Sequence, residues 1–346
     1  MCAYGAINLT RMILPRSFCL SWSGPCPGLV LVVLTVLLNM LVGCASLQEG
    51  EAPAVIQQRA HSGGSAIAIS QSGDLAASGG WEGTLRLWRL PQGSEVRHWR
   101  AHGDSINGIV FLDDDRQVVS AGYDGVIARR SINGSLLQEI TAPAPVTHMV
   151  ADIETDLLLT GHSDGSVRLW QLGDFGLLHT YSTHRGPIKA VAIAPGGARF
   201  ASSSADGSVA TWIAGGKIEM LETPPADAWT LAFSPDGGEL TGGSWFRLFR
   251  WQLDDGSLTT IPTEHLGIIK SIEYIEDGTE LATISRQTDS AVYFLDAQSG
   301  VVKRRFQRHD LCGGDIVVSA DGRYLATTSD DASVRFWVLK GDGEDR

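Results

Sequence analysis

Beyond residue 53, apolar residues occur in short runs separated by turn-forming dipeptides. One unit contains four such runs, KAVAIAP, RFASSSA, SVATWIA and KIEMLET, within residues 189–223. The dipeptides between them are GG at 196–197, DG at 206–207 and GG at 215–216. Short apolar runs bounded in this way are typical of antiparallel strands joined by hairpins. The pattern predicts an all-β chain built from four-stranded units.

The four-run unit recurs along the chain at a regular interval. It is marked by a position that holds tryptophan in five of seven units, as in LRLW, VRLW, VATW, LFRW and VRFW. The seven positions are 88, 130, 170, 212, 251, 295 and 337, separated by 39 to 44 residues. In six units an acidic residue lies six positions earlier; these residues are Glu82, Asp124, Asp164, Asp206, Asp289 and Asp331. A period of about 40–45 residues with four strands per unit is typical of a β-propeller blade.

In this spacing and in its WD-like dipeptides, the stretch 54–346 resembles the WD-repeat family. The resemblance implies an all-β, seven-bladed WD-repeat β-propeller. The chain ends one strand short of a full seventh blade, whereas AVIQQRAH at 54–61 parallels EVRHWRAH at 95–102. We therefore expect residues 54–59 to pair as the outermost strand of the last blade. This N-terminal strand closes the ring and leaves no unpaired sheet edge at the seam.

Histidine, hydroxyl and carboxylate residues recur around the acidic positions, and two interpretations follow. A nucleophilic triad would be needed once, in one cleft with an oxyanion hole. The resemblance implies instead a structural tetrad in each blade, in which buried histidine, hydroxyl, carboxylate and indole N–H satisfy one another. Recurrence favours the tetrads. They are His184, Ser202, Asp206 and Trp212 in the fourth unit, His309, Thr327, Asp331 and Trp337 in the seventh, and His61, Ser78, Glu82 and Trp88 in the first.

Four units depart from the tetrad pattern. Arg130 and Leu295 replace tryptophan in the second and sixth units, and Trp245 replaces the acidic residue in the fifth. The third unit has no histidine in the loop leading into the blade. We expect the second, fifth and sixth blades to be the least stable.

The first 43 residues have the pattern of an export signal. Arg11 and Arg16, with no acidic residue, precede the apolar run GLVLVVLTVLLNMLVG at 28–43. The run is shorter than the ~20 residues of a membrane-spanning helix, which favours a secretory signal peptide; a start at Met12 would make its basic segment more compact. LVGC resembles the lipobox of bacterial lipoproteins and makes Cys44 the expected lipidation site. An uncleaved anchor, or an ordinary signal with a chance cysteine, is the alternative.

This interpretation divides the chain into a signal peptide at 1–43, a lipidated tether at 44–53 and the propeller at 54–346. The lipoprotein resemblance implies a diacylated or triacylated cysteine, and more than one acyl chain is what durable membrane attachment requires. Ala45 after the cysteine favours the outer membrane, by resemblance to Gram-negative lipoproteins. We expect a chain anchored in the cell membrane or the outer membrane and facing the periplasm.

Charge and composition narrow the classes of function. The formal net charge of −12 makes nucleic acid a poor partner. Four of the five cysteines lie in the first 44 residues, so no disulfide framework spans the repeats. The histidines outside the tetrads lack ligand spacing, so we expect no metal, and without a glycine-rich phosphate loop we expect no cofactor. These histidines are His98, His148, His162 and His179.

Binding is expected at one face of the propeller and at the mouth of its channel. In the WD-repeat family, the loops leading into the blades and the turns that carry the aspartates form the usual contact surface. The candidate partner-binding residues are Trp81, Tyr123, Trp229, Trp245, Asn107, Lys189 and Lys270. Exposed aromatic residues are favoured as interface anchors. Blade packing for Trp229 and Trp245, and plain solvated charges for the two lysines, are the alternatives.

Two functions follow, from different classes. The first is a non-catalytic, lipid-anchored scaffold that binds other envelope proteins, with a monomeric propeller inside a hetero-complex. The second is an enzyme or small-ligand-binding propeller of the periplasm that uses its channel. The scaffold leads because no acid–base cluster lies outside the tetrad positions. Converging carboxylates or histidines at the channel mouth would favour chemistry, whereas aromatic and small residues there would favour docking.

Overall fold

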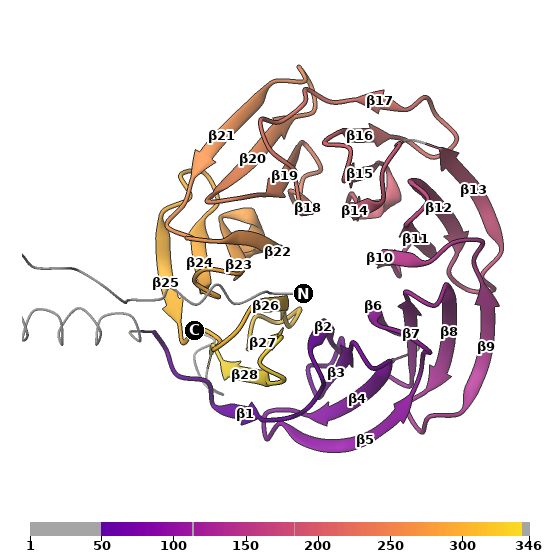
Figure 1. The fold of residues 1–346 in the computed structure, drawn as a ribbon, viewed down its shortest axis with the longest axis vertical. Helices are drawn as coiled ribbons and strands as arrows, with labels where there is room; N and C mark the ends of the chain where they lie inside the picture. The colour runs from indigo at the N-terminus through magenta and orange to yellow at the C-terminus, as the bar shows by residue number, and fades with distance from the viewer. Residues whose placement is uncertain (1–49, 113, 183, 341–346) are drawn as a thin grey trace, which may run out of the picture. The chain divides into compact units, whose positions relative to one another are not determined.

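The computed structural model describes residues 50–112, 114–182 and 184–340, which belong to one compact unit, Gln48–Arg346. Seven four-stranded antiparallel sheets follow one another around a ring (Figure 1). The described helical segments are two single 3₁₀ turns, η2 (Pro195–Gly197) and η3 (Glu276–Gly278). The predicted all-β, seven-bladed propeller is confirmed.

Each blade has its first strand at the centre of the ring and its fourth at the rim (Figure 1). Blade 1 consists of β2 (Gly64–Ile69), β3 (Leu75–Gly80), β4 (Thr84–Arg89) and β5 (Ser94–Arg100). Blade 2 consists of β6 (Ile106–Leu112), β7 (Gln117–Gly122), β8 (Val126–Ser131) and β9 (Leu136–Thr141). Blade 3 consists of β10 (Val146–Asp152), β11 (Leu157–His162), β12 (Ser166–Gln171) and β13 (Leu177–Ser182). Blade 4 consists of β14 (Ile188–Ile193), β15 (Phe200–Ser204), β16 (Val209–Trp212) and β17 (Glu219–Met220).

The remaining blades follow the same order around the ring. Blade 5 consists of β18 (Thr230–Phe233), β19 (Glu239–Gly243), β20 (Arg247–Gln252) and β21 (Leu258–Pro262). Blade 6 consists of β22 (Ile268–Ile275), β23 (Glu280–Arg286), β24 (Val292–Asp296) and β25 (Val302–Phe306). Blade 7 combines β26 (Gly313–Val318), β27 (Tyr324–Ser329) and β28 (Val334–Val338) with β1 (Val55–Gln57).

The seam joins the beginning of the described chain to the last blade. Strand β1 pairs antiparallel with β28, with Val55 opposite Phe336 and Gln57 opposite Val334. The expected closure by an N-terminal strand is confirmed, although the paired segment is shorter than 54–59. Strand pairing ends before Arg59, whose φ of 58° lies in the left-handed region and turns the chain out of the sheet. Strand β1 thereby covers the outer edge of β28, which would otherwise be an unpaired sheet edge.

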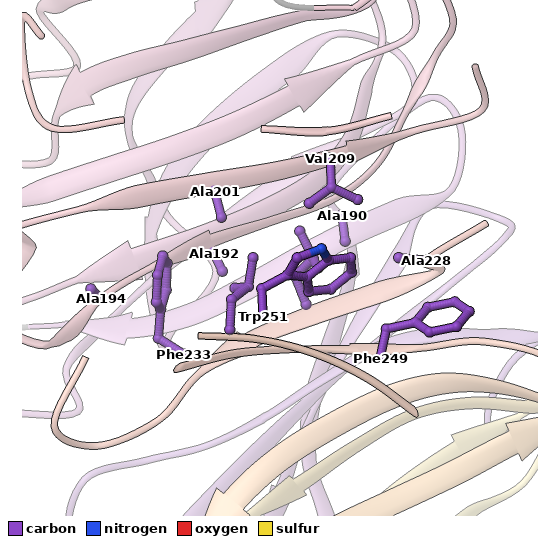
Figure 2. Packing of buried hydrophobic residues seen from close by; sticks show 11 residues of the cluster. Ala190, Ala192, Ala194, Ala201, Val209, Ala228, Phe233, Phe249 and Trp251 are labelled. Carbon is purple, nitrogen blue, oxygen red and sulfur yellow. The ribbon is translucent and has the colours of Figure 1, made fainter. Parts of the chain in front are cut away.

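Hydrophobic packing lies between neighbouring blades. Between blades 4 and 5, small side chains such as Ala190 and Ala201 pack with the aromatic side chains of Phe249 and Trp251 from β20 (Figure 2). All four residues are fully buried. Full burial of one large apolar side chain stabilises a protein by about 1.5–3 kcal/mol. Small residues on one blade and large ones on the next therefore hold the ring together.

In blades 1 and 3, one position of the second strand approaches the next blade so closely that only glycine fits there. A Cβ on Gly161 of β11 would lie 2.3 Å from Ile188 Cγ2 in blade 4. A Cβ on Gly79 of β3 would lie 2.7 Å from Ile106 Cβ in blade 2. Non-bonded carbons prefer about 3.5–4.0 Å, so any side chain at these positions would push two blades apart.

Candidate functional site

Blade 1 contains a complete tetrad. His61, in the loop leading into β2, places its Nε2 2.7 Å from Ser78 Oγ and its Nδ1 2.9 Å from Glu82 Oε1. The indole Nε1 of Trp88 donates a hydrogen bond to Ser78 Oγ at 2.8 Å. One chain of hydrogen bonds therefore runs from indole through hydroxyl and imidazole to carboxylate, and Ser78 is in its middle.

Blade 7 has the same network without its indole. His309 Nε2 lies 2.7 Å from Thr327 Oγ1, and His309 Nδ1 lies 3.0 Å from Asp331 Oδ2. Trp337 was expected to bond the threonine hydroxyl, but its Nε1 donates to the backbone oxygen of Glu51 at 2.8 Å. The chain segment that precedes β1 runs along the rim of the blade, and its backbone therefore accepts the indole hydrogen bond.

In blade 4 a serine separates the histidine from the aspartate. His184 Nε2 lies 2.7 Å from Ser202 Oγ, as expected. Its Nδ1 bonds Ser208 Oγ at 2.6 Å, and this hydroxyl donates to Asp206 Oδ1 at 2.5 Å, whereas His184 and Asp206 are 3.8 Å apart. Trp212 Nε1 has no hydrogen-bond partner among the described residues. The expected membership of Trp212 is wrong, because its indole packs among apolar side chains instead.

Blade 3 obtains its histidine from an unexpected position. His162 lies at the end of β11, two residues after Thr160, and its Nε2 is 2.8 Å from Thr160 Oγ1. Trp170 Nε1 donates to the same hydroxyl at 2.8 Å, and His162 Nδ1 is 3.0 Å from the carbonyl oxygen of Ala144. A histidine that the sequence analysis treated as scattered therefore completes the network.

Blades 2 and 6 keep the histidine–hydroxyl pair and lack the indole. His102 Nε2 lies 2.8 Å from Ser120 Oγ, and His265 Nε2 lies 2.9 Å from Thr283 Oγ1. In blade 6 the imidazole Nδ1 is 3.7 Å from the carboxylate of Asp289 and has no hydrogen-bond partner among the described residues. The two-residue insertion before this aspartate displaces it from the position that it has in blade 1.

Blade 5 has replaced the network altogether. Thr241 Oγ1 lies 2.7 Å from the hydroxyl of Tyr274 in blade 6, and Trp251 Nε1 donates to the backbone oxygen of Glu222 at 2.9 Å. Both polar groups are thus satisfied by atoms outside the tetrad.

The networks hold neutral histidines beside ionised carboxylates. Burial lowers the pKa of His61, although its hydrogen bond to Glu82 opposes the shift. Burial by itself would raise the pKa of Glu82, but hydrogen bonds from Ser62 and His61 outweigh it and hold the pKa at about 2. The same burial lowers the pKa of three further tetrad histidines, which are His102, His184 and His309. A neutral imidazole with its proton on Nδ1 fits this geometry, because Nδ1–H donates to the carboxylate and the bare Nε2 accepts the hydroxyl proton.

The hydroxyl groups of these networks are buried and repeated, which is typical of a structural network and not of a catalytic triad. The side chain of Ser202 is 0% exposed, so no substrate reaches it. Six of the seven blades contain the same histidine–hydroxyl pair. A polar network that is fully hydrogen-bonded inside a blade supports a single packing arrangement, and this structural role of the tetrads stays a prediction.

One face of the ring presents an arc of exposed apolar side chains. We call it the turn face, because it carries the turns between the second and third strands of each blade and the loops that lead into the blades. The arc spans blades 5, 6, 7, 1 and 2 and consists of Phe246, Leu266, Leu311, Trp81 and Tyr123. Among the described residues of blades 3 and 4, this face has no exposed large apolar side chain. Two of the predicted binding residues, Trp81 and Tyr123, are thus exposed where a partner could contact them.

The first residues of the innermost strands line a cavity of about 150 Å³ at the turn face. Three of the predicted binding residues, Trp81, Asn107 and Lys270, line this cavity. The other lining residues include small ones, such as Ser65 and Gly314. Among the described residues Asp315 supplies the only lining carboxylate, and the set therefore fits docking better than acid–base chemistry.

The other predicted binding residues make contacts within the ring. Lys189 Nζ lies 3.8 Å from the ring centroid of Trp229 and pairs with the carboxylate of Asp227. Trp245 is half-buried, and its ring centroid lies 5.4 Å from that of Phe246. These contacts agree with the packing alternative. Partner binding by any of the predicted residues stays a prediction.

The signal peptide at 1–43 and the lipidation site Cys44 lie outside the described residues and stay predictions. Part of the predicted tether is described and contacts the rim of blade 6. The backbone N–H of Glu51 donates to the carbonyl oxygen of Arg305 at 2.8 Å, and Arg304 binds both carboxylate oxygens of Glu51 at 2.8 and 2.7 Å. From residue 50 onwards, the described chain contains no helix that is long and apolar enough to span a bilayer. The same part of the chain contains no group of three or more histidine, cysteine, aspartate or glutamate residues able to hold a metal ion.

Sequence reasoning missed two kinds of network residue. The sequence does not mark His162 as a network residue, because it follows its hydroxyl partner Thr160 by two residues, whereas the other histidines precede theirs. Ser208 could have been found, since a serine follows the aspartate by two residues in three turns. The three serines are Ser166, Ser208 and Ser333, and the hydroxyl of each donates a hydrogen bond to the carboxylate of its own aspartate.

Comparison with known proteins identifies the repeat. The family model described as "WD domain, G-beta repeat" matches residues 54–89, 93–128, 134–171, 175–212 and 301–338. Blade 5 and the first three strands of blade 6, where the tetrad is absent or incomplete, fall in the unmatched stretch 213–300.

Two of the similar curated proteins are named as WD-repeat proteins. WD repeat-containing protein 55 of Rattus norvegicus is 24% identical over 291 residues, which cover 80% of this chain and 74% of the relative. WD repeat-containing protein SL1-17 of Schistosoma mansoni is 29% identical over 53% of this chain and 62% of its own length. U3 small nucleolar RNA-associated protein 21 of Saccharomyces cerevisiae is 27% identical over 49% of this chain, and the match spans only 18% of that longer protein. Because the repeat model covers more than half of the sequence and the ring has seven blades, the chain belongs to the WD-repeat family.

Proposed function

We propose that this chain is a non-catalytic scaffold that binds a partner protein through its turn face. The observation that carries the proposal is the apolar arc over five consecutive blades, from Phe246 in blade 5 to Tyr123 in blade 2. Large apolar side chains that are exposed together on one face are a feature of interaction sites. WD-repeat propellers are protein-interaction scaffolds, which supports the same function.

Protein suits the turn face better than nucleic acid does. The yeast relative is named for its association with a small nucleolar RNA. The formal net charge of this chain is −12, whereas nucleic-acid binding depends on neutralising phosphates with lysine and arginine. We therefore assign the face to a protein partner.

The finer proposal is that Cys44 carries the lipid anchor and that the scaffold works in the bacterial cell envelope. It rests on the basic segment, the apolar run and the LVGC motif of the sequence. The propeller would then face the periplasm from the cell membrane or the outer membrane, as one copy within a complex of several different proteins. The alternative of a channel enzyme is weaker, because Asp315, the single carboxylate that the described residues place at the cavity, already accepts hydrogen bonds from Ser271 Oγ and two backbone N–H groups.

The test is crosslinking on intact membranes, followed by affinity capture of the full-length chain and identification of the crosslinked proteins. The double variant Trp81→Ser/Tyr123→Ser removes two side chains of the arc that are 45% and 44% exposed. We expect it to lose the partners that the native chain captures. The matched control is Leu137→Ser, which changes a residue of blade 2 that is 52% exposed but lies on the rim strand β9.

The proposal requires a difference between the two variants. If the double variant retains every partner, or if the rim variant loses the same ones, the turn face is not the binding surface.

A further inference from the structure

The cavity at the turn face contains hydrogen-bond donors that the protein itself leaves unused. Thr147 Oγ1 is buried and has no hydrogen-bond partner among the described residues. His148 Nδ1 accepts the backbone N–H of Val191 at 3.3 Å, so that the ring proton resides on Nε2. Both residues line the cavity, and a buried donor without an acceptor, such as the Thr147 hydroxyl, is destabilising, so a ligand that supplies an acceptor is favoured.

Lys270 adds an unpaired positive charge to these donors. Its ammonium group forms no hydrogen bond or ion pair with a described residue, although it is attracted at longer range to Asp315. Burial lowers the pKa of Lys270, and the carboxylate of Asp315 opposes that shift. The charged form of this lysine would gain from a direct anionic partner.

The other charged groups at the cavity are already engaged. Arg286 Nη2 donates to Asp330 Oδ2 at 2.8 Å. Both oxygens of Asp315 accept hydrogen bonds, from Ser271 Oγ and from the backbone N–H groups of Ile67 and Ile316. The groups of the cavity that still lack a partner are therefore hydrogen-bond donors and one ammonium group. The ligand that matches them is an anion with acceptor oxygens.

The shape of the cavity decides the form of that anion. Its volume of about 150 Å³ admits one short side chain and excludes a folded element. Trp81, the apolar arc residue of blade 1, lines the same cavity. An acidic side chain that enters the cavity would therefore come from a chain that also contacts the apolar arc.

We propose that this cavity receives the carboxylate of one aspartate or glutamate side chain of a protein partner docked on the turn face. The proposal rests on the proposed function, because it supplies the polar anchor of the same interface. The ammonium group of Lys270 and the donors of Thr147 and His148 bind the carboxylate oxygens, and Trp81 packs against the aliphatic part. Charge-assisted hydrogen bonds in a sheltered cavity are the strong ones, so this contact selects acidic partners.

The experiment selects a random-sequence peptide library, displayed on phage, on the full-length chain. We expect the selected peptides to share one aspartate or glutamate beside apolar residues. Replacement of that acid by its amide, and the variant Lys270→Met, should each weaken binding of the synthetic peptide at least tenfold, which corresponds to about 1.4 kcal/mol. Lys270→Arg keeps the charge and should retain binding within threefold. Lys217→Met, which removes an exposed lysine from the rim of blade 4, is the matched control and should bind like the native chain.

Thermal unfolding of each variant establishes that it is folded, and four results separate the possible failures. If the selected peptides share no acidic residue, the carboxylate site is overturned. The same holds if the acidic residue still contributes to binding in Lys270→Met. In both cases the turn face can still be the binding surface. Peptides that bind equally to Trp81→Ser/Tyr123→Ser overturn the proposed function as well. If inorganic phosphate or acetate binds at millimolar concentration while the peptide acid is dispensable, the cavity is a site for free anions and the proposal fails. If the library yields no peptide at all, the proposal fails too.

Discussion

At the scale of single residues, Ser78 bears most on stability, because its hydroxyl contacts both His61 and Trp88. The variant Ser78→Ala leaves a buried imidazole nitrogen and a buried indole N–H without partners. We expect the free energy of unfolding to fall by about 2 kcal/mol, measured by urea denaturation. Ser94→Ala, in an exposed position on β5, should change it by less than about 0.5 kcal/mol. Equal effects of the two variants would show that the network contributes nothing.

The buried histidines predict how stability depends on pH. Burial lowers the pKa of His162 to about 4, against its ordinary value of 6.5. Between pH 6.5 and 4 the unfolded chain therefore binds a proton at this histidine that the folded chain does not bind, and the contribution of His162 to the free energy of unfolding falls as the pH falls through this window. A depression of this size corresponds to about 3 kcal/mol at most. The tetrad histidines shift in the same direction and steepen the loss.

Between pH 6.5 and 4.5 a buried carboxyl group opposes the histidines, because burial raises the pKa of Glu273 to about 8 and its protonation in the folded chain adds stability as the pH falls. Glu82, with its pKa held at about 2, contributes stability that is lost only as the pH falls below its ordinary value of 4.5. The difference between the native chain and a histidine variant, in urea midpoints measured at pH 7 and pH 5, therefore reports imidazole protonation. The variant His162→Gln should lose less stability between these two pH values than the native chain. Parallel losses would mean that His162 is not neutral in the folded state.

The sequence predicted the members of the networks better than the bonds between them. A repeat spacing brings His184, Ser202 and Asp206 into one turn, because equivalent residues occupy equivalent places in each blade. It does not determine whether a hydroxyl such as that of Ser208 lies between two partners, since that depends on shifts of about 1 Å. His162 was not predicted, because its side chain reaches the hydroxyl of Thr160 from the end of β11 and not from the loop that leads into the blade.

At the scale of the blade, the departures from the tetrad predict unequal stability around the ring. Blade 5 has no histidine network, blade 6 has an imidazole nitrogen without a partner, and blade 2 lacks the indole. We expect backbone amides of the second and third strands in these blades to exchange hydrogen faster than those of blade 1. Hydrogen-exchange mass spectrometry of the full-length chain measures this. Equal protection in blade 1 and blade 5 would contradict the link between network and stability.

The fold itself was predictable at this scale because two independent patterns agree. The four apolar runs of each unit identify the strands, and the regular spacing of the tryptophan positions gives the number of blades. The seam was predictable from the likeness of residues 54–61 to rim strands elsewhere in the chain. The length of the seam strand was not, because the left-handed backbone at Arg59 has no clear sequence signal.

For the whole molecule, the free part of the predicted tether is shorter than residues 44–53, because its last residues are bound to the propeller. Gly50 lies against the backbone of Phe306, and Glu51 is held by Arg304 and Arg305 at the rim of blade 6. Only residues 45–49 separate Cys44 from this contact, and the six Cα–Cα steps from residue 44 to residue 50 span at most about 20 Å. A lipid on Cys44 would therefore hold the rim of blade 6 close to the membrane surface.

This geometry makes membrane attachment through Cys44 testable on the intact protein. Under the proposed lipidation, Cys44→Ser removes the thiol that carries the lipid, and the full-length chain should move from the membrane fraction to the soluble fraction. Cys312→Ser changes the buried cysteine of blade 7 and should leave the distribution unchanged. A short attachment at the rim also predicts that a ten-residue insertion after Leu47 leaves the chain in the membrane fraction but weakens crosslinks between blade 6 and lipid headgroups. Membrane association that survives Cys44→Ser would show that another segment anchors the chain, and the envelope proposal would then lose its basis in the LVGC motif.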